Sequence, residues 1–287
     1  MATMDAMKNP RQALVLACLM QFVGCGIGNV VSSIVAASNV SGNWQIQSAA
    51  GASTTATPTA GLLMIGALAS SGTSVTGTFR LANLALPNNC GTPLQQIVTV
   101  SGTIDALGNL NLTSAAFSGS VITIQLVVPA VATQFGAGTV AIAGGACTFA
   151  SSPAIGAEFA PVTGTYSGAV AANTSFNTPP ILSGTATMTL TQAATAGSDG
   201  SFPVGGSVSF SGGGCSSSTP VTGTVSGGEV MLASVPVTTL ALPSTRVIAV
   251  VNPAGSQLYN ASIGYALGPC GAGVLTYGTY TGNLLKQ

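Results

Sequence analysis

The feature that most restricts how this chain can fold is an alternation of apolar and hydroxyl-bearing residues with a period of two. The segment 185–191 reads TATMTLT. Its threonines fall on one face, and the other face carries Ala186, Met188 and Leu190. The same alternation recurs in three further segments: 74–81, 109–113 and 207–210. Successive side chains of a strand point to opposite sides, so the pattern predicts strands with one face in a core and the other in water.

Turn-forming residues separate these segments. Ser70-Ser71-Gly72, Leu107-Gly108-Asn109, Asp199-Gly200 and Gly227-Gly228 each interrupt an alternating run. Short strands joined by such turns are typical of an antiparallel β-sandwich or an up-and-down β-barrel. The expected fold class is therefore all-β, and nothing after Gly24 has the spacing of an amphipathic helix.

The sequence also contains an internal repeat. The segment 100–104, VSGTI, matches 221–225, VTGTV, and Gly42-Asn43-Trp44 matches Gly164-Thr165-Tyr166. A repeat of this length indicates tandem duplication. We therefore expect two β units, residues 41–160 and 161–287, with about six to eight strands in each.

Four cysteines follow the same repeat. The interval from Cys90 to Cys147 is nearly the same as the interval from Cys215 to Cys270. Four cysteines allow three pairings, and the duplication favours Cys90–Cys147 and Cys215–Cys270. Each bridge would stabilise its unit by about 4 kcal/mol in the chain-entropy model. A zinc site is the rival interpretation, but the sequence has no histidine and no CxxC pair, so no metal site is expected.

The segment 1–24 has the features of a signal peptide. Lys8 and Arg11 precede the apolar run 13–23, and the small residue Gly24 stands before Cys25. A positive start, a short apolar run and a small residue before the cut are typical of secretory signals. The run is also shorter than the roughly 20 apolar residues of a transmembrane helix. Met7 is a second candidate start residue.

The end of this segment, Phe22-Val23-Gly24-Cys25, resembles the lipobox of bacterial lipoproteins. The resemblance implies that the thiol of Cys25 receives a diacylglyceryl group, that the signal is cut before it, and that the new amino terminus is acylated, commonly with palmitate. Two or more acyl chains anchor a protein stably in a membrane. Residues 25–40 would then form the lipidated cysteine and a tether. Gly26, in place of the aspartate of inner-membrane lipoproteins, implies the outer membrane of the cell envelope. An ordinary signal peptide with an incidental thiol at Cys25 is the alternative.

A second resemblance concerns the start of each unit. Gly42-Asn43-Trp44 is similar to the G-x-W element that opens lipocalin- and avidin-type barrels, and the second unit has Tyr166 in place of tryptophan. This resemblance implies a calycin-like carrier with a small apolar ligand in its barrel. The alternative is that Trp44 and Tyr166 are aromatic plugs that close one end of each core. The repeats as a whole resemble those of uncharacterised Thr- and Gly-rich exported lipoproteins.

Low charge excludes several function classes. Charged residues make up 3% of the chain, against about 25% in ordinary soluble domains. Cleavage before Cys25 leaves seven of them: Arg80, Asp105, Glu158, Asp199, Glu229, Arg246 and Lys286. No basic patch is available for nucleic acid. Without histidine a Ser-His-Asp triad is impossible, and fold stability is expected to vary little with pH.

These observations favour a non-enzymatic role. Asp105, Asp199 and Glu229 lie in or beside expected turns, where carboxylates commonly serve turn geometry. We therefore expect no catalytic residue and no cofactor. The leading hypothesis is a lipid-anchored structural, adhesive or binding module, and the alternative is the carrier. A hydrolase would need two of the four carboxylates to converge in a cleft. The sequence identifies neither a protein or small-molecule partner nor a ligand-binding residue.

Overall fold

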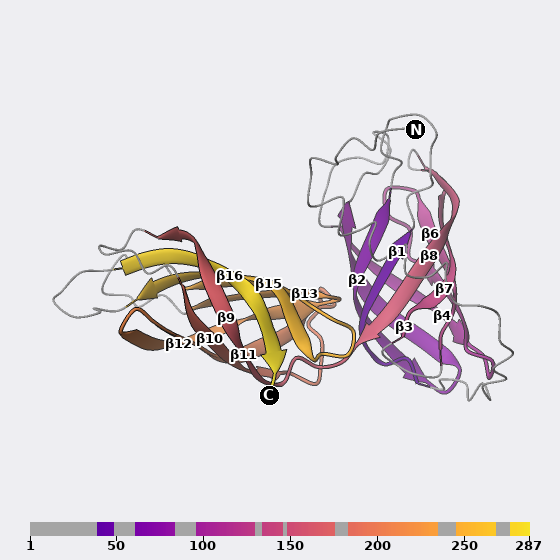
Figure 1. The fold of residues 1–287 in the computed structure, drawn as a ribbon. Helices are drawn as coiled ribbons and strands as arrows, with labels where there is room; N and C mark the ends of the chain where they lie inside the picture. Colours follow the sequence, from indigo (N-terminus) through magenta and orange to yellow (C-terminus); the bar gives the residue numbers. More distant parts are fainter. Residues whose placement is uncertain are drawn as a thin grey trace, which may run out of the picture. The chain divides into compact units, whose positions relative to one another are not determined.

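The computed structural model describes residues 39–48, 61–83, 96–129, 134–145, 148–175, 183–234, 245–267 and 276–287. The regular elements in these ranges are sixteen β-strands, which form two closed barrels of eight strands each (Figure 1). The all-β fold and the tandem duplication are thus confirmed. Of the two expected architectures, the chain adopts the barrel.

Consecutive strands are neighbours throughout both barrels, and every pair is antiparallel. The first barrel comprises β1 (Gly42–Ser48), β2 (Leu62–Ser71), β3 (Ser74–Asn83), β4 (Ile97–Ile104), β5 (Asn109–Ser114), β6 (Val121–Val127), β7 (Gly136–Ala143) and β8 (Phe149–Phe159). The second comprises β9 (Gly164–Ser175), β10 (Ser183–Gln192), β11 (Phe202–Gly212), β12 (Cys215–Ser226), β13 (Glu229–Ser234), β14 (Arg246–Val251), β15 (Gln257–Leu267) and β16 (Thr276–Lys286).

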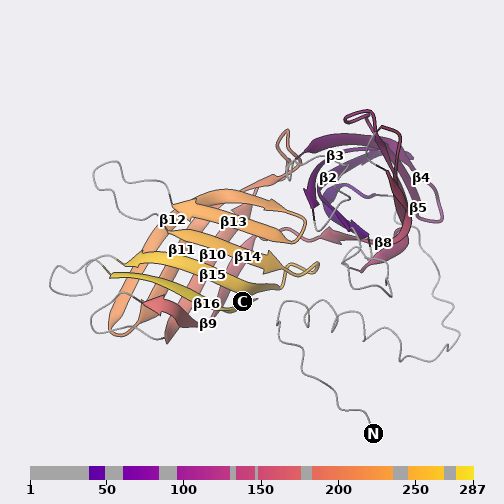
Figure 2. The same cartoon turned by 90° about the horizontal axis from the view of Figure 1, so that it is seen from above.

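Each barrel closes between its first and last strands. β1 pairs with β8 in the first barrel, and β9 pairs with β16 in the second. Figure 2 looks into the first barrel and shows its strands arranged in a ring. Closure leaves no unpaired edge strand, which removes the template for edge-to-edge association.

The period-two alternation sorts side chains between the interior and the outer face. On β10, Ala186, Met188 and Leu190 point inward and are at most 1% exposed, while the intervening threonines point outward. Trp44 and Tyr166 are buried in the first and second interiors. The indole of Trp44 donates a hydrogen bond to the Val40 carbonyl. Both aromatic residues are therefore part of the packing, as the plug interpretation expects.

The two rims of each barrel differ. We call the rim at which β1 and β9 begin the near rim, and the opposite one the far rim. The expected turns at residues 70–72, 107–109, 199–200 and 227–228 all lie at near rims. Gly108 (φ +80°) and Gly227 (φ +52°) adopt backbone conformations that favour glycine. β1 and β3 end, and β2 and β4 begin, at the far rim of the first barrel.

Several expectations lie outside the described residues. They concern the signal peptide, Cys25, the tether up to residue 38, and Cys90, Cys147 and Cys270. β1 continues through Ser48, and residues 49–60 are not described. Within the described ranges, no helix is long and apolar enough to cross a membrane.

Candidate functional site

The described residues of both barrels belong to one compact unit, and specific contacts join them. The turn between β12 and β13 contacts the outer face of β1 and β2. The side-chain amide of Asn43 donates to the Gly227 carbonyl (2.9 Å), and its oxygen accepts from the Gly227 N–H (2.6 Å). The Gly228 N–H donates to the side-chain oxygen of Gln45 (3.1 Å). We call this set of contacts the junction.

Apolar side chains on the outer face of the first barrel complete the junction. Ile65 is fully buried although it points outward, and a Cβ atom at Gly227 would come within 2.8 Å of its side chain. Ala157 and Phe159 of β8 belong to the same buried cluster as the core of the second barrel. Glycine at position 227 therefore serves both the turn conformation and the close approach.

Three charged residues gather beside the junction. Arg80 of β3 donates to the Glu229 carboxylate of β13 at 3.0 Å. The pKa of Asp199 is lowered, mainly by hydrogen bonds from the side chain and backbone of Ser201, with a smaller contribution from the charge of Arg80. The arrangement neutralises Arg80 at the edge of an otherwise uncharged contact.

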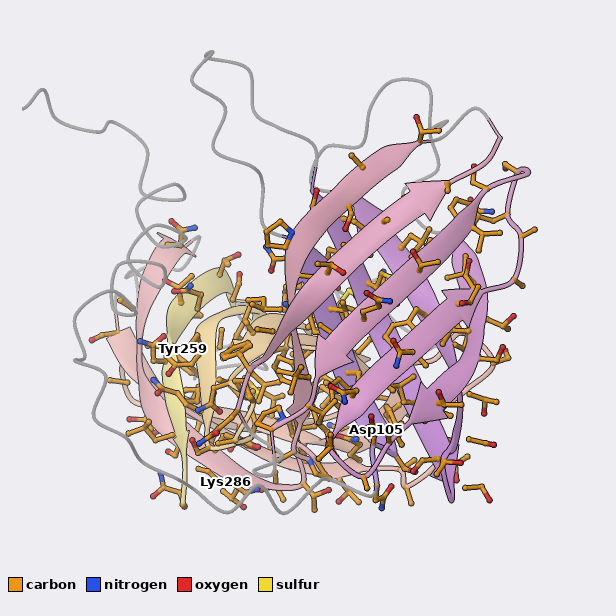
Figure 3. All side chains as sticks on the ribbon, turned by 90° about the vertical axis from the view of Figure 1, so that its right-hand side faces the viewer. Asp105, Tyr259 and Lys286 are labelled. Atoms are coloured by element: carbon orange, nitrogen blue, oxygen red, sulfur yellow. The ribbon has the colours of Figure 1, made fainter. Side chains whose placement is uncertain are left out.

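The carboxylates do not form a catalytic pair. Asp105 accepts hydrogen bonds from Asn109 and Leu107 within its own turn, which lowers its pKa (Figure 3). Asp199 likewise organises its turn, and Glu229 is paired with Arg80. A general acid needs a raised pKa, and burial raises the pKa of Glu158. The turn roles expected for Asp105 and Asp199 are therefore observed.

Glu158 and Lys286 occupy equivalent positions over the two aromatic plugs. Glu158 lies opposite Trp44 in the β1–β8 ladder, and Lys286 lies opposite Tyr166 in the β9–β16 ladder. The Lys286 ammonium is 5.8 Å from the centre of the Tyr166 ring (Figure 3). Burial raises the pKa of Glu158 from 4.5 to about 7. The two barrels thus place opposite charges at the same point.

Glycine makes room for both charged side chains. A Cβ atom at Gly42 would come within 2.7 Å of the Glu158 carboxylate, and one at Gly164 within 2.6 Å of the Lys286 side chain. Tyr166 donates a 2.7 Å hydrogen bond to the Gly255 carbonyl, and burial raises its pKa to about 12. The G-x-aromatic element therefore has a packing explanation in each barrel.

A groove of about 860 Å³ lies on the outer face of β2 to β5. One wall carries outward-facing hydroxyl groups on β3, β4 and β5, namely those of Thr76, Thr78, Thr99, Ser101 and Thr113, and Ser41 and Ser114 also line it. The other wall comes from the connection between β10 and β11 and the start of β11, with Ala194, Thr195, Ala196 and Phe202. No charged residue is among the described residues that line it. We call this cavity the hydroxyl groove.

The outer face of the second barrel also carries hydroxyl groups, but several of these bond one another. Thr165 pairs with Thr189 (3.3 Å), and Ser167 pairs with Thr187 (3.0 Å). The five hydroxyls of the hydroxyl groove, by contrast, bond no other residue in the described ranges. They therefore remain available to solvent or a ligand.

An exposed apolar patch lies on the outer face of the second barrel, over β13, β14 and β15. Met231 lies opposite Ile248, and Val250 lies opposite Tyr259 (Figure 3). Each of the four is between 38% and 50% exposed. Scattered exposed apolar residues are normal, and this patch has no role in the junction.

The topology places the connections that hold the cysteines. The connection with Cys90, between β3 and β4, and the one with Cys147, between β7 and β8, both start at the far rim of the first barrel. In the second barrel Cys215 begins β12 at the far rim, and Cys270 belongs in sequence to the connection that starts there at the end of β15. Among the described residues, no group of His, Cys, Asp and Glu is arranged to hold a metal ion.

Comparison of the chain with protein-family models, with curated proteins and with solved structures found no match in any of the three. Sequence reasoning missed the junction, Glu158 and the opposite wall of the hydroxyl groove. For the junction the sequence signal was the polar Asn43 inside the G-x-W element, with nothing to indicate its partner, whereas the alternation over 74–81 did place hydroxyl groups on the outer face of the first barrel.

Proposed function

We propose that the protein is an exported lipoprotein, anchored in the outer membrane through Cys25, that works at the cell envelope as a structural, adhesive or binding module. The observation that carries the choice of a surface-acting module is the packing of the barrel interiors, while the anchor is inferred from the sequence Phe22-Val23-Gly24-Cys25. Side chains of the strands themselves occupy these interiors, including Trp44, Phe79 and Met64 in the first and Phe210 and Tyr280 in the second. A module that works through its outer surface needs such a filled core.

The carrier alternative has less support from this packing. A carrier needs a cavity of at least about 300 Å³, lined mainly by apolar groups. The hydroxyl groove instead lies outside the barrel walls and carries hydroxyl groups. Native mass spectrometry of the gently extracted protein distinguishes the two hypotheses, because a carrier would retain a small apolar molecule and a filled module would not.

The anchor proposal has its own experiment. Intact mass spectrometry of the membrane-extracted protein should give a mass that begins at Cys25 and includes the lipid. The Cys25→Ser variant should lose the lipid and leave the membrane fraction, whereas Cys215→Ser should stay anchored. A lipid-free mass for the natural chain would instead make it a secreted protein.

The proposed disulfides, Cys90–Cys147 and Cys215–Cys270, are supported by the internal repeat. In each barrel the two connections involved start at the same rim on opposite sides of the ring of strands, so each bridge would have to span the mouth of the barrel. The duplicated positions also correspond, since β3–β4 is equivalent to β11–β12 and β7–β8 to β15–β16. An exported chain meets oxidising conditions in which such bridges persist.

A further inference from the structure

The hydroxyl groove offers hydrogen-bonding groups in a regular array. Thr78 lies opposite Thr99, and Ser101 lies opposite both Thr76 and Thr113. Neighbouring strands are about 4.8 Å apart, so the five hydroxyls form a continuous patch over three strands. Each hydroxyl can both donate and accept a hydrogen bond. The patch can therefore match a ligand that itself alternates donors and acceptors.

The charge of the groove narrows the class of ligand. No charged side chain is among its described lining residues, and the nearby Arg80 is neutralised by Glu229. An ionic ligand would lose hydration without gaining a counter-charge. A purely apolar ligand would leave the hydroxyls unpaired. Both classes are therefore disfavoured.

The opposite wall supplies small apolar surfaces. Ala194, Ala196 and Phe202 line this side of the groove together with Thr195, and Ala67 and Ala69 of β2 add apolar surface on the first wall. Sugar rings carry hydroxyl groups around their edges and C–H groups on their faces, so they can contact both kinds of wall. The volume of about 860 Å³ lies within the range of small-ligand sites.

We propose that the hydroxyl groove binds a neutral oligosaccharide chain. This inference rests on the proposed role as a binding module and specifies its ligand class. The interaction consists of hydrogen bonds and apolar contacts, so it should change little between low and high salt. Individual neutral hydrogen bonds contribute modestly, and the affinity is expected to be weak for a single site.

The experiment is a glycan array probed with the full chain in detergent, followed by calorimetric titration with the neutral oligosaccharide that gives the strongest signal. Neutral oligosaccharides should bind, and uronate-containing or sulfated ones should not bind better. The double variant Thr99→Val/Ser101→Val should weaken binding roughly tenfold, because two hydrogen bonds are lost.

The duplication provides a matched control. Thr222 on the outer face of β12 is the repeat equivalent of Ser101 and lies outside the groove, so Thr222→Val should leave binding unchanged. Ala115→Trp should block the groove while it keeps every hydroxyl. Circular dichroism checks the fold of each variant. The proposal would be overturned if no neutral oligosaccharide on the array bound the protein, or if anionic oligosaccharides or uncharged peptides bound it more tightly. It would also be overturned if all three variants had the same affinity as the natural chain.

These outcomes are separate from those of the anchor experiment. Loss of the lipid in the Cys25→Ser variant concerns the location of the protein and does not alter the groove. A failed glycan titration with an intact lipid anchor would therefore reject the ligand class and leave the proposed envelope location standing.

Discussion

Asn43 of the first barrel and Gly227 of the second, 184 residues apart in the sequence, are joined by two hydrogen bonds that pair a side-chain amide with the backbone N–H and C=O of one residue. Asn43 is only 2% exposed. Both backbone polar groups of Gly227 bond this one side chain, so the pair should contribute strongly to holding the barrels together.

Replacement of Asn43 by leucine should lower the free energy of unfolding by about 2–3 kcal/mol, because two hydrogen bonds are lost and the backbone N–H and C=O of Gly227 lose their partner. Urea unfolding followed by circular dichroism measures the change, and the fluorescence of Trp44, the single tryptophan, follows the first barrel. Thr165→Ala, at the equivalent but partly exposed position of the second barrel, should cost less than about 0.5 kcal/mol. Equal costs for the two variants would contradict the importance of the pair.

Glu158 should make stability depend on pH. Its pKa is raised from 4.5 to about 7 by burial, so between these values the folded state keeps a proton that the unfolded chain has released. Stability should therefore fall as pH rises from 4.5 to 7 and level off above 7. Solvent screening of this partly exposed group limits the effect to about 1 kcal/mol. This revises the expectation from the sequence that pH would matter little.

The Glu158→Gln variant tests that assignment, because it removes the titrating group and should flatten the profile between pH 4.5 and 7. The emission of Trp44, which lies opposite Glu158 on the neighbouring strand, should shift with pH in the natural chain only. An unchanged slope in the variant would assign the pH dependence to another group.

Replacement of the negative Glu158, which lies opposite Trp44, by a positively charged residue should stabilise the first barrel. Glu158→Lys would reproduce the arrangement of Lys286 over Tyr166, with an ammonium over an indole ring. Cation–π contacts with tryptophan contribute about 0.5–1 kcal/mol at exposed sites, and the substitution also removes a poorly solvated carboxylate. Thermal unfolding at alkaline pH, where Glu158 is ionised, should show a higher Tm. A lower Tm would contradict this prediction, because it would mean that the site beside Trp44 differs from the site beside Tyr166 in more than the sign of the charge.

The ion pair beside the junction should matter less than its hydrogen bonds. Arg80 and Glu229 have side chains that are 20% and 42% exposed, and partly exposed pairs contribute at most about 1 kcal/mol. Glu229→Gln should therefore lower stability by about 0.5 kcal/mol at low salt, and the difference should shrink at high salt. A loss as large as that of Asn43→Leu would reverse this ranking.

Peptide mapping of the unreduced protein should recover Cys90 with Cys147 and Cys215 with Cys270. Reduction should lower the stability of each barrel by about 4 kcal/mol in the chain-entropy model. Cys90→Ser should weaken the first barrel, reported by Trp44, and Cys215→Ser should leave that signal nearly unchanged. Recovery of crossed pairs between the two barrels would contradict the duplicated bridge.

The strands could be predicted from sequence because a half-buried strand leaves a local pattern. Met188 and Leu190 alternate with threonine, and both lie inside the barrel as expected. Alternation cannot distinguish a barrel from a sandwich, since both architectures bury one face of every strand. That choice depends on the pairing of β1 with β8 and of β9 with β16, which joins strands distant in the sequence.

The junction could not be predicted for a related reason. Ile65 and Phe159 occupy positions that the alternation assigns to solvent, yet both are buried. Their burial comes from contact with another unit rather than from the barrel that holds them. The raised pKa of Glu158 was equally hidden, because only the folded structure shows that its carboxyl lies within a half-buried site.

The common rim of the first and last strands determines how each barrel would respond to mechanical tension. β1 begins and β8 ends at the near rim, and these two strands are antiparallel neighbours. A pull on the two ends of the barrel therefore separates them one residue pair at a time, like a zipper, instead of shearing the whole ladder at once. Each barrel should yield to stretching at low force, and the connections at the far rim should remain outside the line of tension until the barrel has opened.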